Sequence, residues 1–182
     1  MKNARNLTFY SRKINSFLQV LDFTPTVRDG RGRLRPPSEF KVLAFKDPDM
    51  SVFAYALLNS SLFRWFVDVV SDGSHLNMRE VNHITFDAKQ AVASASKLRP
   101  LCKSLTKTLV KTSFERVMVY KHDTLTVQCI VPKHAKSVID QIDEVLSKQY
   151  RFTPEELDFI INYDIKYRMG LGSGATELDD DE

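Results

Sequence analysis

Leu57-Leu58-Asn59-Ser60-Ser61-Leu62-Phe63-Arg64-Trp65-Phe66 is the segment from which we interpret the whole chain. It is apolar and rich in aromatic residues, and polar residues 59–61 predict a bend or a second helix N-cap inside a helical region. The second helix is expected to end near Val70, and a polar turn from Ser71 to Asn77 follows it. The aromatic side chains share a helix with leucines, which favours the protein core over stacking on a base. The pattern predicts two buried helices that lead into a hydrogen-bonding turn.

The sequence N-terminal to this segment predicts short strands and one loop. Residues 7–23 are expected to form a strand or a short helix, and residues 39–45 alternate enough for a strand. Residues 28–38 are expected to form a loop, because two glycines and two adjacent prolines do not suit a regular element. A helix capped by Asp47 or Asp49 then leads into the quoted segment.

The C-terminal side predicts further helices and one hairpin. In chain order we expect a strand over 81–86, helices over 87–98 and 100–110, a hairpin over 117–131, and helices over 135–148 and 153–170. Pro100 is placed in the first turn of its helix, and Thr153 with Glu156 forms a capping box. Asp164 and Arg168 are four residues apart and able to pair. The expected fold class is therefore α+β, with short, largely antiparallel strands packed against several helices.

Composition predicts a folded protein with a basic body. Of the 182 residues 43% are hydrophobic and 27% are charged, which is typical of a globular chain. The net charge is +3, but residues 177–182 carry five of the acids and no base, so residues 1–176 carry +8. A basic body suits a polyanionic partner, although a solvated basic surface is an equally common explanation. We expect a target-recognition-like portion over 1–86, a helical portion with the hairpin and the C-terminal helix over 87–170, and a disordered acidic tail over 171–182.

Three stretches together resemble the specificity region of bacterial N6-adenine DNA methyltransferases from restriction–modification systems, above all the type IIG enzymes. They are residues 57–66, the turn that begins at Ser71, and the segment from Thr153 to Gly170. In that family the matching region follows the catalytic domain and contains the target-recognition portion. The resemblance implies a chain that recognises double-stranded DNA and works with a methyltransferase catalytic domain or subunit. Whether the chain is a fragment, a split gene product or a standalone protein is left open.

No catalytic constellation is recognisable in the sequence. A methyltransferase of this kind needs a glycine-rich turn after a strand to hold S-adenosylmethionine, and an Asn/Asp-Pro-Pro-aromatic motif for the flipped adenine. Neither is present, since Gly170 to Gly174 follows a helix and 47–50 has the wrong third and fourth residues. Glu39 and Lys41 match a nuclease motif only superficially. We therefore expect no catalysis, no metal and no cofactor in this chain, with S-adenosylmethionine bound only by the catalytic domain.

Two segments are candidates for DNA contact. Four arginines lie on the loop over 28–38 and Lys41 lies just beyond it, and such side chains can reach phosphates or guanine edges. The turn after the aromatic helix offers donors and acceptors that can match base edges, although turn residues often bond their own backbone instead. The candidate residues are Arg28, Arg31, Arg33, Arg35, Lys41, Asp72, Ser74, His75, Asn77 and Arg79.

The alternative function is a protein-interaction module that docks on a separate methyltransferase or on another subunit of a defence system. A small enzyme of unrecognised type is a weaker possibility, because no constellation supports it. No signal peptide is recognisable, no stretch suits a membrane span, and Cys102 and Cys129 have no metal-ligand spacing. We therefore expect a cytoplasmic protein that has no membrane partner.

Overall fold

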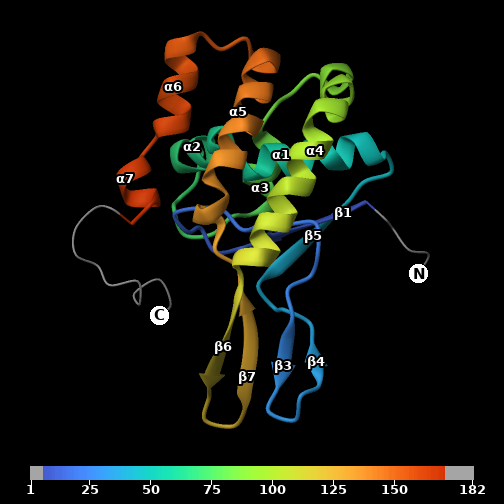
Figure 1. Cartoon of the computed structure of the whole chain (residues 1–182), viewed down its shortest axis with the longest axis vertical. Helices are drawn as coiled ribbons and strands as arrows, with labels where there is room; N and C mark the ends of the chain where they lie inside the picture. Colours follow the sequence, from blue (N-terminus) through green and yellow to red (C-terminus); the bar gives the residue numbers. More distant parts are fainter. Residues whose placement is uncertain (1–5, 171–182) are drawn as a thin grey trace.

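The computed structural model describes residues 6–170 and confirms an α+β fold with antiparallel sheets. Helices gather at one end and a narrow sheet extends from the other (Figure 1). The strands are β1 Leu7–Ser11, β2 Val20–Leu21, β3 Val27–Asp29, β4 Leu34–Arg35, β5 Phe40–Ala44, β6 Phe114–Val119 and β7 Thr124–Cys129. The helices are α1 Pro48–Asn59, α2 Ser61–Val70, α3 Met78–His83, α4 Ala88–Thr112, the 3₁₀ turn η1 Pro132–Ala135, α5 Lys136–Tyr150, α6 Pro154–Asn162 and α7 Ile165–Arg168.

The helices form what we call the helical body, and α4, with 25 residues, is the longest of those that the structure describes. One face of α4 is buried along its whole length, with Ala91, Ala95, Leu98, Cys102, Leu105 and Leu109 at helical spacing. This face packs against α1 on one side and α5 on the other, and α6 packs against α2 and α5. Phe53 and Phe63, from α1 and α2, are fully buried in the same core.

The junction between α1 and α2 forms as the polar triplet predicts. The backbone N–H of Ser60 donates to the Leu57 carbonyl at 3.1 Å and ends α1, while its hydroxyl accepts from the Phe63 N–H at 3.0 Å and begins α2. The first N–H groups of α2 would otherwise have no partner. The buried Asp143 carboxylate of α5 accepts from the N–H of Ser61 at 3.1 Å and that of Leu62 at 3.3 Å. One serine and one aspartate thus fix the start of α2 against α5.

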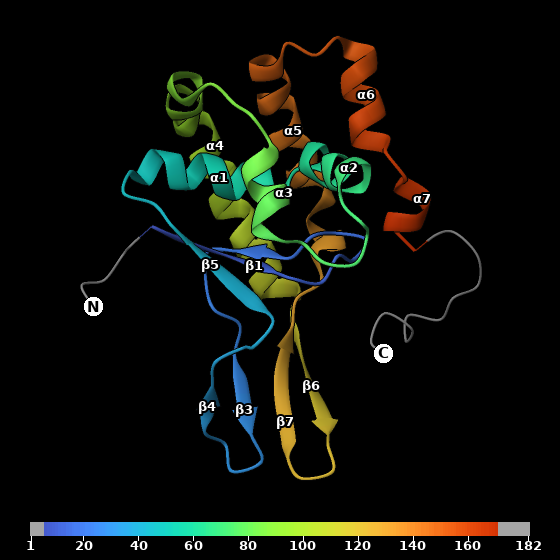
Figure 2. The ribbon, with the colours of Figure 1, turned by 180° about the vertical axis from the view of Figure 1, so that it is seen from behind.

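The strands form two separate antiparallel sheets. The order β2-β1-β5 gives a small sheet in which Phe9 lies opposite both Leu21 and Val42. The order β4-β3-β7-β6 gives a second sheet that leaves the helical body, as both ribbon views show (Figures 1 and 2). We call this second sheet, residues 27–35 and 114–129, the β-arm. It consists of two hairpins joined through β3 and β7, with Val27 opposite Val127.

The expected boundary between residues 86 and 87 falls between α3 and α4. Elements from both sides of it pack together, because β3 pairs with β7 and α1 packs on α4. The expected acidic tail over 171–182 lies outside the described residues.

The prediction of a loop over 28–38 is wrong in part, because β3 and β4 form a hairpin closed by a four-residue turn. The backbone N–H of Asp29 donates to the Arg33 carbonyl, and that of Gly32 donates to the Asp29 carbonyl at 2.7 Å. Gly32 has φ +75°, a left-handed conformation that glycine adopts without strain. The glycines close a turn here, and Pro36 and Pro37 follow the second strand.

Three other predictions of secondary structure are also wrong. The strand expected over 81–86 does not form: residues 81–83 belong to α3 and residues 84–86 have no regular structure. Glu80 accepts from the Asn77 N–H at 2.8 Å, as a capping-box glutamate does, and so favours a helix here. Pro100 lies inside one continuous helix, because the buried face of α4 continues through it without a shift. The C-terminal helix breaks after Asn162, where Asp164 has φ 49°.

The expected Asp164–Arg168 pair is likewise not formed. The Arg168 guanidinium is buried, donates to the Ser61 hydroxyl at 3.3 Å and lies 4.5 Å from the centre of the Phe17 ring. Since α7 follows a change of direction after α6, Arg168 points towards the start of α2 instead of along its own helix. This contact holds the C-terminal segment against the helical body.

Candidate nucleic-acid interface

The first turn of the β-arm is organised by the carboxylate of Asp29. Its Oδ1 accepts from the N–H of Arg31 at 3.0 Å and that of Arg33 at 2.9 Å. Its Oδ2 accepts from the Nε of Arg33 at 2.9 Å and that of Arg35 at 3.2 Å. The backbone N–H of Arg33, with the other donors, outweighs desolvation and lowers the pKa of Asp29 to about 2. The turn is therefore rigid, and its carboxylate is fully occupied.

The arginines of this turn differ in what their side chains contact. Arg33 and Arg35 are ion-paired to Asp29, and Arg28 donates to the Gly32 carbonyl at 3.4 Å. Within residues 6–170 the Arg31 side chain is exposed and makes no hydrogen bond or ion pair. An anion can therefore bind the Arg31 side chain without breaking a contact within the protein.

The second turn of the β-arm, residues 120–123, lies beside the first. Asp29 lies opposite Leu125 in the sheet, and a Cβ on Gly30 would come 3.5 Å from the Thr124 carbonyl oxygen. Lys121 and His122 in this second turn are exposed and have no side-chain partner in the part of the chain that the structure describes. Sequence analysis found the hairpin but did not link it to the arginine turn, because more than 80 residues separate them in the chain.

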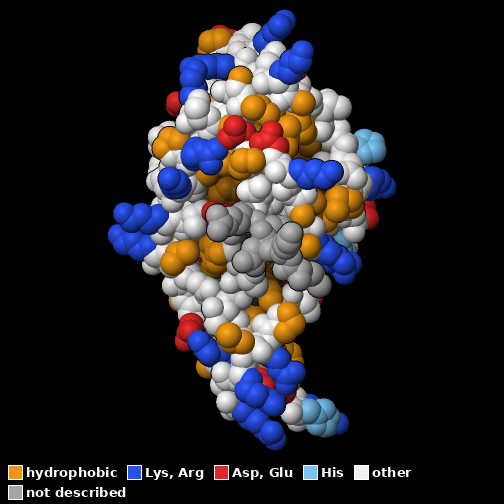
Figure 3. All heavy atoms as spheres, turned by 90° about the vertical axis from the view of Figure 1, so that its right-hand side faces the viewer, with side chains coloured by type: hydrophobic (Ala, Val, Ile, Leu, Met, Phe, Trp, Pro, Cys, Tyr) orange, Lys and Arg blue, Asp and Glu red, His pale blue; other side chains and the backbone are white. Residues whose placement is uncertain are grey.

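Basic side chains therefore gather at the free end of the β-arm. The two turns and their flanking positions carry Arg28, Arg31, Arg33, Arg35 and Lys121 against the two acids Asp29 and Asp123. Figure 3 shows lysine, arginine and histidine side chains over the narrow end of the molecule. Apolar groups accompany them, since Leu34 is 69% exposed, Val119 80% and Tyr120 51%. The free end of the β-arm therefore presents cations together with exposed apolar side chains.

Lys41 lies apart from the turns, on the edge strand β5 of the small sheet. It is exposed and faces Tyr10 in the register of β1 and β5. Lys41 therefore belongs to the other sheet and lies outside the β-arm.

The other candidate segment, from Ser71 to Arg79, uses most of its polar groups within itself. Asp72 accepts from the Ser74 N–H at 3.0 Å, and this bond with others lowers the pKa of Asp72 despite desolvation. Ser74 and His75 share a hydrogen bond at 2.9 Å, and the Asn77 side-chain amide donates to the His75 carbonyl at 3.1 Å. Side chains engaged in this way hold the turn in one conformation.

Arg79 is bound to the carboxylate that caps α3. Its Nε donates to Glu80 at 2.9 Å, and Glu80 is buried while Arg79 is exposed. Burial would raise the pKa of Glu80, but hydrogen bonds from its own N–H, from Arg79 and from Asn77 outweigh burial and lower it. The turn is also fixed beside the end of β1, because the Leu76 N–H donates at 2.8 Å to the carbonyl of Arg12, the residue that follows this strand. It is therefore a well-ordered surface of the helical body, separate from the free end of the β-arm.

A shallow apolar groove lies on the helical body, between α2 and α6. Its lining includes Trp65, Phe152, Phe159 and Ile160, with Glu155 and Glu156 at its edge. Trp65 is thus half-buried rather than fully enclosed, while Phe63 is fully buried as expected.

Within residues 6–170 no group of three or more His, Cys, Asp or Glu side chains is arranged to hold a metal ion. Cys102 is buried and Cys129 is half-buried. Across the same residues no helix combines the length and apolar character that crossing a bilayer requires.

Comparison with known proteins gave no match to any protein-family model, curated protein or solved structure.

Proposed function

We propose that this chain recognises the sequence of double-stranded DNA, as the specificity portion of a restriction–modification adenine methyltransferase, and carries no catalytic centre itself. The observation that supports it best is the cluster of basic residues at the free end of a sheet that extends from the helical body. Lysine and arginine side chains supply most of the affinity of DNA-binding proteins through phosphate contacts. In this proposal S-adenosylmethionine is bound by a methyltransferase catalytic domain or subunit, and this chain supplies the DNA contacts.

Two surfaces have different roles in this proposal. The end of the β-arm, above all Arg31, supplies phosphate contacts and therefore affinity. The turn from Ser71 to Arg79 is held rigidly on the helical body, so any base contact from His75 or Arg79 would start from a fixed position. Rigid placement of a donor or acceptor is what base discrimination needs.

The test is the salt dependence of DNA affinity, measured by fluorescence anisotropy with a labelled duplex. Each phosphate contact that releases a counterion contributes about −0.9 to the slope of log K against log salt. We expect the wild type to show a steep slope and Arg31→Ala to flatten it by about 0.9, because the variant loses one phosphate contact. The Arg31 side chain has no partner among the described residues, so its removal breaks no contact within the protein. Arg31 is preferable to Arg33 or Arg35, because removing either of those side chains would also take away one hydrogen-bond donor to Asp29. An affinity that does not respond to salt contradicts the proposal.

The second candidate function is a protein-interaction module, and the groove beside Trp65 favours it. An apolar groove with acidic residues at its edge suits an apolar segment that carries basic residues. If the chain binds no DNA but forms a stoichiometric complex with a methyltransferase subunit, and Phe159→Ala breaks that complex, this function replaces the first.

A further inference from the structure

We propose that the two turns of the β-arm contact the two strands of one DNA duplex across its major groove. Residues 30–33 meet one phosphate backbone, and Lys121 and His122 meet the other. This inference rests on the proposed function. It adds a second set of residues that contact DNA and names the groove of the duplex in which the contacts are made.

The relative position of the two turns is fixed by the sheet. β3 and β7 pair directly, with Arg28 opposite Thr126 and Asp29 opposite Leu125, so both hairpins end at the same level. A Cβ on Gly30 would lie 3.6 Å from the Asp123 carboxylate, which shows how closely the two turns approach each other. The turns therefore meet a ligand as one unit.

The spacing of the two hairpins suits one groove better than the other. Strands in a sheet lie about 4.8 Å apart, so the midlines of hairpins β3–β4 and β6–β7 lie two spacings, or about 10 Å, apart. The major groove of B-form DNA is about 12 Å wide and the minor groove about 6 Å. Contacts from both turns to opposite backbones therefore match the major groove.

The side chains at the two turns are available for such contacts. Arg31 on one turn, and Lys121 and His122 on the other, are exposed and make no internal side-chain bond among the described residues. Arg33 and Arg35 stay paired with Asp29 and hold the turn in shape. Asp29 acts as a positioning residue, since it fixes the backbone on which Arg31 is carried.

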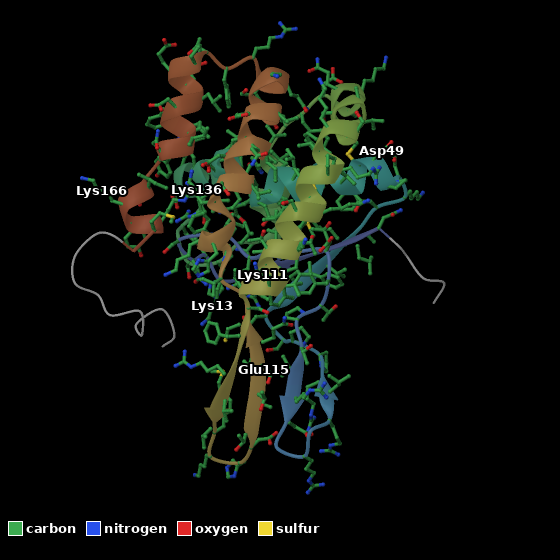
Figure 4. All side chains as sticks on the ribbon, viewed as in Figure 1. Lys13, Asp49, Lys111, Glu115, Lys136 and Lys166 are labelled. Carbon is green, nitrogen blue, oxygen red and sulfur yellow. The ribbon has the colours of Figure 1, made fainter. Side chains whose placement is uncertain are left out.

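The experiment compares affinities for a duplex and for one of its single strands. We expect the double variant Lys121→Ala/His122→Ala to bind the duplex several-fold more weakly and to lower its salt slope by about 0.9. Affinity for the single strand should change less, because one strand can engage one turn at a time. Lys166→Ala is the matched control, since Lys166 is exposed on α7, far from the β-arm (Figure 4). The thermal melting of each variant shows that it is folded.

Groove-specific ligands test the second half of the inference. Methyl green, which occupies the major groove, should displace the protein, and netropsin, which occupies the minor groove, should not. Double-stranded RNA should bind poorly, because its major groove is deep and narrow. Competition by netropsin alone would overturn the assignment of the groove.

The two proposals fail differently. If Arg31→Ala weakens duplex binding but the Lys121/His122 variant binds as the wild type does, the inference is wrong and the proposed function stands. If the wild type itself shows no salt-dependent binding to duplex DNA, the proposed function is wrong.

Discussion

The helical body and the β-arm each contain a buried aspartate, and the pKa values of the two carboxyl groups shift in opposite directions. In the helical body, burial among apolar helices raises the pKa of Asp143 to about 6, although Ser61 and Leu62 donate to it. In the β-arm, the N–H of Arg33 and further donors lower the pKa of Asp29 to about 2. Burial among apolar side chains thus dominates the surroundings of Asp143, whereas hydrogen bonds and ion pairs dominate those of Asp29.

The largest expected effect tests the packing of the helical body. Phe63→Ala should lower the free energy of unfolding by about 3–5 kcal/mol, because the ring is fully buried and its loss leaves a cavity. Val119→Ala on the β-arm, 80% exposed, should change it little. Urea unfolding followed by the fluorescence of Trp65, the single tryptophan, measures both. Similar losses for the two variants would mean that the β-arm is packed as the helical body is.

The next effect concerns Asp143 and its dependence on pH. A carboxyl whose pKa is raised on folding takes up a proton in the folded state, so its stabilisation is complete below about pH 4 and lost as pH rises through about 6. Relative to Asp143→Asn, the free energy of unfolding of the wild type should fall by about 2–3 kcal/mol between pH 4 and pH 7. A difference between the two proteins that is independent of pH contradicts the assignment.

For Asp29 the expected effect is local and has the opposite sign. Because folding lowers the pKa of Asp29, its carboxylate stabilises the folded state fully at pH values above the ordinary pKa near 4. This stabilisation is lost as the pH falls towards 2. Asp29→Asn should speed amide hydrogen exchange at Arg31 and Arg33, whose N–H groups donate to the carboxylate. The exchange rate at Leu105 of α4 should not change. Asp123→Asn is the control, because among the described residues only the Thr124 N–H donates to its carboxylate. Unchanged exchange at Arg31 would show that the turn does not depend on the carboxylate.

The smallest expected effect is that of Asn77→Ala in the turn of the helical body. Its amide donates to the His75 carbonyl, so its loss should lower the free energy of unfolding by about 1 kcal/mol. Selection of binding sites from a random DNA library should give the same profile as the wild type. A relaxed profile at unchanged stability would instead assign the Asn77 side chain to base recognition.

The elements that sequence predicted correctly carry local signals. Asp47, Ser60 and Thr153 cap helices where expected, and the α+β class follows from strands and helices that are each recognisable alone. The wrong predictions occur where contacts with residues distant in the sequence determine the local structure. Pro100 lacks the backbone N–H that would donate to the Ser96 carbonyl, but the buried packing of Leu98 and Cys102 on either side keeps α4 continuous.

The candidate site shows the same division between local and distant information. Clustered arginines are visible in the sequence, but the sequence does not show that Asp29 is the acceptor that pairs with Arg33 and Arg35 and not with the Arg31 side chain. The neighbourhood of Lys121 depends on the pairing of β3 with β7, and no local pattern encodes a pairing across about 100 residues.

That pairing also sets an order of events in folding. Hairpin β6–β7 is local and can close within microseconds, but β3 cannot pair with β7 until a loop of roughly a hundred residues has closed. During synthesis β3 and β4 leave the ribosome before β7 does, so the edge of β3 that pairs with β7 has no strand partner at first. The two turns can therefore lie side by side only after β7 has been synthesised and this long loop has closed.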